Sequence, residues 1–462
     1  MVTRIAVLAR FAILFLWPLA VCPQDWPEFR GPNRSGVSNA RGLPIRFGPG
    51  LNVAWAAEIP KGRSSPVVKD HHLFLSAADR ENLILLAFDT RIGKILWRYS
   101  MARSRRNEID DVRNDPASAT PATDGTAVYA FFQDFGLLAV SVNGKLLWKL
   151  PLGPFINNYG MGTSPIVYGE NVFLQCDQLR GSYVIAVNKR TGKIRWRKSR
   201  PSTIEGWATP LILPETGQLI TLGSSGLESL DLETGKTRWS LLANDGLMIP
   251  SPITDGETLI ATIRGSDQPT FPSWEQTLTD LDANKDGKIS PDELAKRYQR
   301  NSFGIADPNR DGYITEEEWN HFRNRGVGEF GITGISLKDR RILWRYKRGI
   351  PYVPSPVLYQ GIVFSVRTGG IITAIDLRTG QVLKEGRSTD AMGEYFASPV
   401  GAEGKIYLSN SDGIVSVLKS GSEWEVIGVN DLQDSISATP AIADSALFFR
   451  TYSKLYCFRQ QH

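Results

Sequence analysis

Two twelve-residue segments contain the oxygen ligands of a calcium-binding loop. The first is DANKDGKISPDE, from Asp282 to Glu293, and the second is DPNRDGYITEEE, from Asp307 to Glu318. Both match D-x-[DN]-x-[DN]-G-x5-E, a loop that wraps once around Ca²⁺ and supplies the six to eight hard oxygens that this ion takes. We therefore predict two bound calcium ions, one in each loop.

The position of a residue in such a loop gives its role. Positions 1, 3 and 5 give side-chain oxygens, position 7 a backbone carbonyl, position 9 a water-bridged contact, and position 12 both carboxylate oxygens. The predicted ligands are, in order, Asp282, Asn284, Asp286, Lys288, Ser290 and Glu293 in the first loop, and Asp307, Asn309, Asp311, Tyr313, Thr315 and Glu318 in the second. Ile289 and Ile314 are placed to join the two loops by a short β contact.

The flanks of both loops predict helices. Ser290 with Glu293, and Thr315 with Glu318, form capping boxes, and Ser273 with Gln276 caps a helix before the first loop. Loops between helices make this segment an EF-hand pair. The two loops start only 25 residues apart, so one helix must serve both, and we expect calcium to be a constitutive structural ligand. A regulatory role remains the alternative.

Two short signatures recur along the rest of the chain. One is a Ser/Thr-Pro pair that opens an apolar strand. The other is an alternating strand, a turn containing Gly, and a Trp four residues after that Gly. The prolines are Pro66, Pro121, Pro165, Pro210, Pro252, Pro356, Pro399 and Pro440. The hairpins end at Trp97, Trp148, Trp196 and Trp239, with weaker copies at Trp344, Lys384 and Trp424.

The spacing of the prolines predicts the fold. It is 41 to 55 residues except for one interval of 104, which holds the calcium loops. Units of this length with four short strands are typical of a β-propeller. We predict an all-β, eight-bladed propeller of four-stranded blades, with the small α-helical EF-hand pair inserted in blade 5. The strand 51–59 should complete blade 8, and each Trp should cover the next blade.

Charge is distributed unevenly between the predicted EF-hand insertion and the rest of the chain. The net charge is +5, but residues 267–329 have 13 acidic and 8 basic side chains.

The apolar run Phe11–Val21 after Arg4 and Arg10 predicts a signal peptide, hence a secreted or periplasmic protein. A lipid anchor at Cys22 is the less favoured alternative, because Val21 is bulky. The predicted parts are 1–24 signal peptide, 25–50 extended arm, 51–263 propeller, 264–330 EF-hand insertion and 331–462 propeller. We expect no transmembrane segment in the mature chain.

The repeated hairpins also indicate a family. LLAFDTRIGKILW and VIAVNKRTGKIRW resemble the tryptophan-docking repeat of the pyrroloquinoline-quinone (PQQ)-like β-propellers, and DWPEFRGPNRSG (residues 25–36) resembles the lead-in of secreted bacterial members. This resemblance covers most of the chain. It implies the propeller fold, but it leaves function open because the superfamily contains both quinoprotein dehydrogenases and non-catalytic scaffolds.

The enzyme hypothesis is a PQQ-dependent dehydrogenase acting on an alcohol or sugar. Trp207 is then the candidate platform for the quinone, with Asp110, Asp111, Asn157, Asn158 and Glu205 as polar neighbours. The adjacent-cysteine pair that such dehydrogenases place beside the cofactor is absent, because the three cysteines are Cys22, Cys176 and Cys457. No ligand set can be aligned from one sequence, so catalysis is not favoured.

The favoured hypothesis is a calcium-binding, non-catalytic binding or scaffold protein. Its partner, a protein or a polysaccharide, would bind the loop face that carries the EF-hand pair, where the variable loops gather. The basic run Arg103–Arg106 is followed by acidic residues, so we expect a solvated loop and no nucleic-acid partner.

Overall fold

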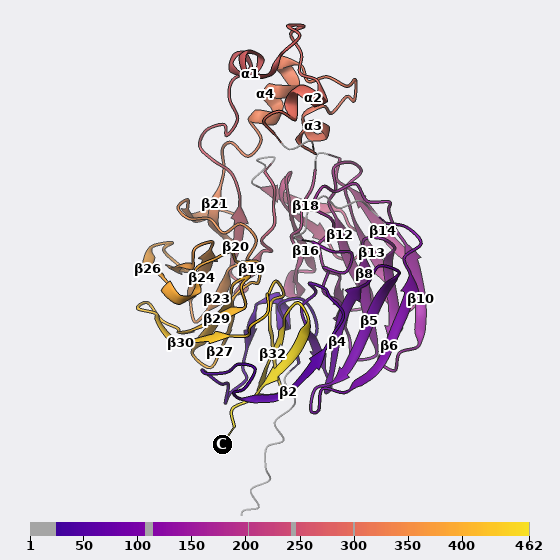
Figure 1. Cartoon of the computed structure of the whole chain (residues 1–462), viewed down its shortest axis with the longest axis vertical. Coiled ribbons are helices and arrows are strands. Elements are labelled where there is room, and N and C mark those ends of the chain that lie inside the picture. Colours follow the sequence, from indigo (N-terminus) through magenta and orange to yellow (C-terminus); the bar gives the residue numbers. More distant parts are fainter. Residues whose placement is uncertain (1–24, 107–113, 202, 242–245, 299–300, 462) are drawn as a thin grey trace, which may run out of the picture.

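The computed structural model describes residues 25–106, 114–201, 203–241, 246–298 and 301–461. Eight sheets form a ring of blades, which confirms the predicted propeller (Figure 1). The predicted signal sequence Phe11–Val21, the alternative anchor Cys22, and Asp110 and Asp111 lie outside the described residues.

Each blade has four antiparallel strands, which are named in order from the innermost to the outermost. Blades 1 to 4 consist of β3 (Val67–Lys69), β4 (His72–Ala78), β5 (Asn82–Asp89) and β6 (Ile95–Ala102); β7 (Ala122–Thr123), β8 (Ala127–Phe132), β9 (Gly136–Ser141) and β10 (Leu146–Pro151); β11 (Ile166–Tyr168), β12 (Asn171–Cys176), β13 (Tyr183–Asn188) and β14 (Ile194–Ser199); β15 (Leu211–Leu213), β16 (Gln218–Gly223), β17 (Gly226–Asp231) and β18 (Thr237–Leu241). Blades 5 to 8 consist of β19 (Ile253–Thr254), β20 (Thr258–Ile263), β21 (Gly331–Ser336) and β22 (Ile342–Tyr346); β23 (Val357–Tyr359), β24 (Ile362–Arg367), β25 (Ile371–Asp376) and β26 (Val382–Arg387); β27 (Val400–Ala402), β28 (Lys405–Ser409), β29 (Ile414–Lys419) and β30 (Glu425–Asp431); β31 (Ala441–Ala443), β32 (Ala446–Arg450), β33 (Lys454–Phe458) and β2 (Val53–Glu58).

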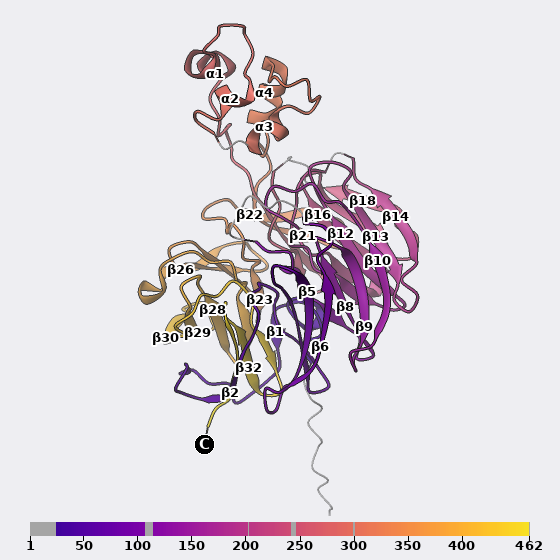
Figure 2. The same cartoon turned by 45° about the vertical axis from the view of Figure 1, so that its right-hand side comes forward.

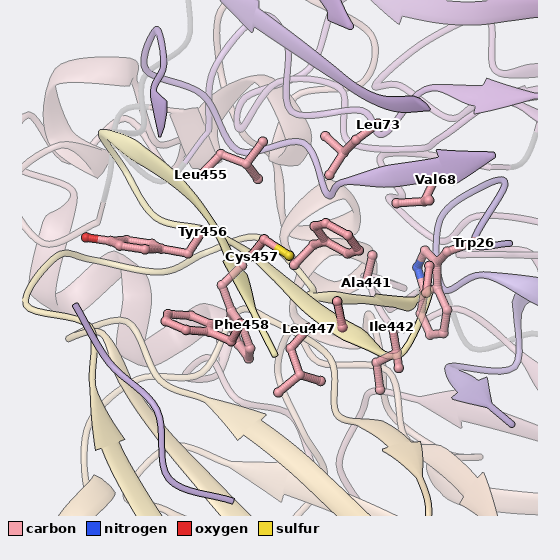
Figure 3. Close-up of a cluster of buried hydrophobic side chains, with 14 of the residues drawn as sticks. Trp26, Val68, Leu73, Ala441, Ile442, Leu447, Leu455, Tyr456, Cys457 and Phe458 are labelled. Carbon is pink, nitrogen blue, oxygen red and sulfur yellow. The ribbon is translucent and has the colours of Figure 1, made fainter. Parts of the chain in front are cut away.

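The ring closes through the N-terminal strand. Strand β2 pairs antiparallel with β33, with Trp55 opposite Cys457, so both ends of the chain build blade 8, as expected. Figure 3 shows the junction of blades 8 and 1, where Cys457 lies among buried apolar side chains. Cys176 and Cys457 are both buried and free.

Five tryptophans of the repeat dock on the glycine turn of the next blade. The two others differ: the Trp239 indole donates to the Gln218 side chain of its own blade, and the Trp424 indole donates to the Lys384 carbonyl of the preceding blade. The Trp148 indole Nε1 donates to the carbonyl of Lys189 at 2.8 Å, and its ring covers Gly192. A Cβ at Gly192 would lie 2.7 Å from the indole, and the residue has φ +70°, so both space and backbone require glycine. Trp55, Trp97, Trp196 and Trp344 make the same contact with Gly93, Gly144, Gly235 and Gly380. Blade 5 has Arg340 in place of this glycine.

The segment after Asp25 lies inside the ring and contacts the inner strands of most blades. Trp26 forms an antiparallel bridge with Val68 of β3, and β1 (Val37–Ser38) runs parallel to β27. Arg30 is fully buried, and its guanidinium donates to the carbonyls of Ser355 and Pro356 at 2.9 and 2.6 Å. The arm therefore ties separate blades of the ring together.

The insertion leaves blade 5 after β20 and returns at β21. It contains α1 (Trp274–Leu281), α2 (Pro291–Leu294), α3 (Asn301–Ala306) and α4 (Glu316–Arg323), around a small core that includes the fully buried Trp319. Its two connecting segments run side by side, and the Ser266 N–H donates to the Gly326 carbonyl at 2.9 Å. Figures 1 and 2 both show the helices beyond one end of the propeller.

Strand direction defines two ends of the ring. Strands alternate in direction, so the insertion, between the second and third strands, lies at the same end as the links between blades; we call this the EF-hand end. The turns between third and fourth strands lie at the opposite, hairpin end. No helix in the described part of the chain is long and apolar enough to cross a membrane.

Candidate functional site

The first predicted calcium loop is shaped by hydrogen bonds from its own backbone. The Asp282 carboxylate accepts from the N–H groups of Asp286 and Gly287 at 3.3 and 3.0 Å. The Asn284 side-chain oxygen accepts from Asp286 N–H at 3.0 Å. These bonds, together with one of 2.9 Å from the Lys288 N–H to the Asp286 carboxylate, turn the side chains at positions 1, 3 and 5 toward the inside of the loop. Gly287, with φ +75°, makes the reversal that a larger residue would oppose.

Glu293 closes the loop from its far end. One carboxylate oxygen accepts from the Ser290 N–H and hydroxyl at 2.9 and 2.8 Å, and the other accepts from the Ala283 N–H at 2.9 Å. The hydrogen bond from the Ser290 N–H lowers the pKa of Glu293, so it is ionised at neutral pH. Thr315 and Glu318 repeat the capping box in the second loop.

The two loops are joined as the sequence suggested. Ile289 and Ile314 exchange two backbone hydrogen bonds of 3.1 and 2.8 Å, and both side chains are fully buried. Lys288 and Tyr313, each one residue before these isoleucines, are also close: the Lys288 ammonium lies 5.2 Å from the centre of the Tyr313 ring. The two loops are therefore paired both through their backbones and through these side chains.

The donors of both loops fit calcium. Each loop offers three carboxylates, an amide oxygen, a hydroxyl and a backbone carbonyl, all hard oxygens. Within the described ranges no three His, Cys, Asp or Glu side chains gather closely enough to hold a metal by themselves. In an EF-hand that is expected, because half of the ligands are of other types and the carboxylates here bind the loop backbone.

A ring of hydroxyl groups lies at the EF-hand end of the channel. In seven of the eight blades, the Ser or Thr before the repeated proline donates its backbone N–H to the hydroxyl of its counterpart in the next blade, at 2.8 to 3.1 Å. The ring consists of Ser65, Thr120, Ser164, Thr209, Ser251, Ser355, Ser398 and Thr439. We did not predict this role; the signal was the hydroxyl residue that precedes all eight prolines.

The hydroxyl ring lines part of a chamber of about 200 Å³. Its lining includes Phe29 of the N-terminal arm and the side chains of Tyr159, Trp207, Tyr352 and Phe396. Trp207, the candidate platform, is held by a 2.6 Å hydrogen bond from its indole to the Gly160 carbonyl and by an edge contact with Tyr159. The chamber is therefore mainly aromatic and hydroxyl-lined, and Arg63 is the charged residue among its described lining.

The predicted polar neighbours of Trp207 lie elsewhere. The Asn158 N–H donates to one Glu205 carboxylate oxygen, and the Asn158 amide lies 3.5 Å from the other. Asn157 is buried, with its amide 3.4 Å from the Asp177 carbonyl. None of these three residues lines the chamber. Burial raises the pKa of Glu205 to about 7, and the charge of Arg325, in the returning arm of the insertion, opposes that rise.

Comparisons with known proteins agree with this architecture. The family described as outer membrane protein assembly factor BamB matches residues 52–174, 159–246 and 321–462, and EF hands match residues 275–296 and 301–322. The outer membrane protein assembly factor BamB of Yersinia pestis is 23% identical over 297 residues, which are 59% of this chain and 67% of that protein.

Solved structures show the same fold at low identity. The structure of BamB from Moraxella catarrhalis has a TM-score of 0.58 and 13% identity, covering 88% of this chain and 99% of its own. A europium-containing methanol dehydrogenase has a TM-score of 0.61 and 12% identity, with coverages of 95% and 98%. The family match spans well over half of the sequence. This chain therefore belongs to the family described as outer membrane protein assembly factor BamB, and it has an EF-hand pair inserted in blade 5.

Proposed function

We propose that this chain is a secreted or periplasmic calcium-binding propeller that acts as a non-catalytic binding or scaffold protein. The observation that carries the proposal is the composition of the chamber: among the described residues that line it, none has a carboxylate. A quinone dehydrogenase would need a base, and carboxylate ligands for its calcium ion, at this place. The partner, a protein or polysaccharide, would bind the EF-hand end.

Calcium would be held by the twelve loop ligands, from Asp282 to Glu293 and from Asp307 to Glu318. Calcium bound in both loops would neutralise the excess negative charge of the insertion. It would also stabilise the paired loops relative to the two segments that connect them to blade 5. The test is a calorimetric titration of the full chain with calcium. We expect uptake of two ions, reduced to one in Glu293→Gln and in Glu318→Gln. No uptake at millimolar calcium would contradict this part of the proposal.

The alternative is a PQQ-dependent dehydrogenase acting on an alcohol or sugar. The specific observation in its favour is that Trp207 lines the chamber, as a quinone platform would. Asn158 and Glu205, however, bind each other, and Asp177, whose carbonyl lies 3.4 Å from the Asn157 amide, is fully buried. The described residues do not supply a base or a cation site facing Trp207, so they do not fit the quinone, and no catalytic step is derived from it.

One experiment separates the two functions. The purified chain is incubated with PQQ and calcium, then assayed for dye reduction with alcohols and sugars and for quinone absorbance after gel filtration. We expect neither activity nor retained quinone. Retained quinone that is lost in Trp207→Ala, together with dye reduction, would overturn the non-catalytic proposal. Capture of an envelope protein or polysaccharide that is lost when the insertion is deleted would support it.

A further inference from the structure

The lining of the chamber follows the repeat in two rows. One row is the hydroxyl ring. The other has the residue three positions before each repeated proline; all eight of these residues are half-buried and line the chamber, whereas the residue after each of them is buried. We call this second row the chamber wall. From blade 1 to blade 8 it consists of Arg63, Ser118, Gly162, Trp207, Ile249, Val353, Phe396 and Ser437.

The chamber wall is apolar on one side and polar on the other. The wall residues of the consecutive blades 4 to 7 are aromatic or aliphatic, and those of blades 8, 1 and 2 are serine and arginine. In blade 3, a Cβ at Gly162 would lie 3.1 Å from the Trp207 indole, so glycine leaves room for that ring. A ligand that fits the chamber should therefore also have an apolar side and a polar side.

The polar side of the wall is held in place by hydrogen bonds and has little net charge. The Arg63 guanidinium donates to the Ser437 hydroxyl at 2.7 Å and lies 3.9 Å from the Asp115 carboxylate. Asp115 therefore balances the charge of Arg63. This side of the chamber offers hydrogen-bonding groups in fixed positions, as Trp207 on the other side offers a fixed aromatic ring.

The hydroxyl ring adds donors that the fold does not use. A Ser or Thr hydroxyl has one hydrogen to donate and two lone pairs that accept. Seven hydroxyls of the ring accept a backbone N–H, but none of the eight donates its hydrogen to any residue that the structure describes. A ligand of the chamber should therefore bring acceptor oxygens to this row.

Three classes of ligand do not match this lining. A cation would need a carboxylate, and the described residues of the lining have none. A small anion would need a positive charge that is not already balanced, but Arg63 lies beside Asp115. A wholly apolar ligand would leave the hydroxyl hydrogens without acceptors, which costs binding free energy.

An uncharged sugar ring matches both rows. One face of a pyranose consists of C–H groups that pack on an aromatic ring, and the oxygens around its edge accept and donate hydrogen bonds. Pockets for small ligands combine apolar and aromatic side chains with a few fixed polar groups in this way. Trp207 and Phe396 would contact the C–H face, and the hydroxyl ring would bind the oxygens.

The N-terminal arm limits how a glycan could enter. Phe29 lines the chamber, whereas Pro27 and Glu28 line a separate hollow that also includes His71 in the β3–β4 turn, at the hairpin end. No residue lines both spaces. The arm therefore lies between them, and a polymer cannot thread through the ring. A glycan would enter from the EF-hand end by its terminal residue.

We propose that the chamber binds the terminal, uncharged pyranose residue of a glycan. This inference rests on the proposed function and deepens it, because it chooses a polysaccharide partner over a protein. The two can fail separately. If no sugar binds but an envelope protein is captured at the EF-hand end, the sugar site is wrong and the scaffold function stands. If a bound sugar is oxidised by retained quinone, the site stands and the non-catalytic function is wrong.

The test is saturation-transfer NMR of the full chain, with calcium present, against the methyl pyranosides of glucose, galactose and N-acetylglucosamine. We expect at least one to bind with a dissociation constant of about 1 to 10 mM. Trp207→Ala should weaken binding about tenfold, and Trp207→Phe, which keeps an aromatic face, should restore it to within about threefold of the wild type. Tyr168→Ala, an exposed aromatic position at the hairpin end, is the matched control and should bind as the wild type does.

A second variant tests the hydroxyl ring without disturbing the fold. The Ser65 hydroxyl forms no hydrogen bond with the residues that the structure describes, so Ser65→Ala should keep the wild-type stability and bind the sugar about threefold more weakly. Absence of saturation transfer from all three glycosides at about 50 mM, or equal binding by Trp207→Ala and the wild type, would overturn the proposal. Binding of 3-phenylpropionate more than about tenfold tighter than every glycoside would assign the chamber to an amphipathic acid and overturn it too.

Discussion

The propeller and the EF-hand insertion are stabilised by different means. In the propeller, an indole on a glycine turn joins five pairs of neighbouring blades and a hydroxyl link joins seven, so apolar contacts and neutral hydrogen bonds recur around the ring. The insertion has a core of one small cluster, and its loops concentrate carboxylates that repel one another without a cation. The comparison indicates that the propeller is stabilised by contacts repeated between blades, whereas the EF-hand insertion depends on bound calcium.

The largest expected effect comes from removing a docking indole. Trp344 is buried, covers Gly380 and donates to the Leu377 carbonyl at 2.7 Å. Trp344→Ala should lower the free energy of unfolding of the propeller by about 4 kcal/mol, measured by guanidinium denaturation, because it leaves a cavity and an unpaired carbonyl.

The matched control is in the other region. Trp319 is fully buried in the insertion, and its indole donates to the Pro272 carbonyl at 3.0 Å. Trp319→Ala should melt the EF-hand pair and abolish calcium uptake, while the main transition stays where it is. If both variants shifted the main transition equally, the two regions would be one cooperative unit and the contrast between them would be wrong.

The next effect concerns the arm. Arg30 is fully buried and gives its guanidinium hydrogens to carbonyls of blade 6 and of its own turn. Burial lowers its pKa to about 9, so it is still charged at neutral pH. Arg30→Met should reduce the free energy of unfolding by about 3 kcal/mol, because several carbonyls lose their donor. Arg41→Met, an exposed position of the same arm, should change that free energy by less than about 0.5 kcal/mol. Equal effects would mean that the arm does not brace the ring.

The sequence predicted the repeated parts of this molecule far better than the unique ones. The number of blades, the closure by β2 and the turn glycines could be predicted because the sequence patterns behind them recur. A blade whose own pattern is weak can still be recognised by its spacing from the blades with clear patterns. The calcium loops could be read because their ligands are local in sequence. The path of the arm could not be predicted, since two of the carbonyls that Arg30 binds lie more than three hundred residues away in the sequence. The same limit applies to the chamber: Trp207 lines it, but which polar groups face it depends on how separate blades meet.

The pH dependence of stability tests the boundary between the two regions. Glu205 is fully buried near the insertion, and its pKa is raised from 4.5 to about 7. A raised carboxyl pKa means that the folded state binds the proton more tightly, so its stabilising contribution is complete below about pH 4.5 and is lost as the pH rises through 7. Compared with Glu205→Gln, the wild type should lose about 2 to 3 kcal/mol between these values. Glu215→Gln, an exposed control, should follow the wild type, and parallel curves for all three proteins would contradict the assignment.

Removal of calcium should have the smallest effect on stability, and it should affect the EF-hand insertion without affecting the propeller. At 1 mM calcium, a site with a dissociation constant of about 10⁻⁴ M is stabilised by about 1.4 kcal/mol. Chelation should therefore raise amide exchange in α1, α2 and α4 by roughly tenfold for each emptied site, measured by mass spectrometry. The β-strands should be unaffected, because no loop ligand belongs to a blade. Glu293→Gln should reproduce half of this change in the presence of calcium, whereas Glu316→Gln, an exposed non-ligand in the first turn of α4, should not. Exchange that rises in β20 and β21 as well would show that the ion also stabilises blade 5, and the ligand-dependent region would then extend into the ring.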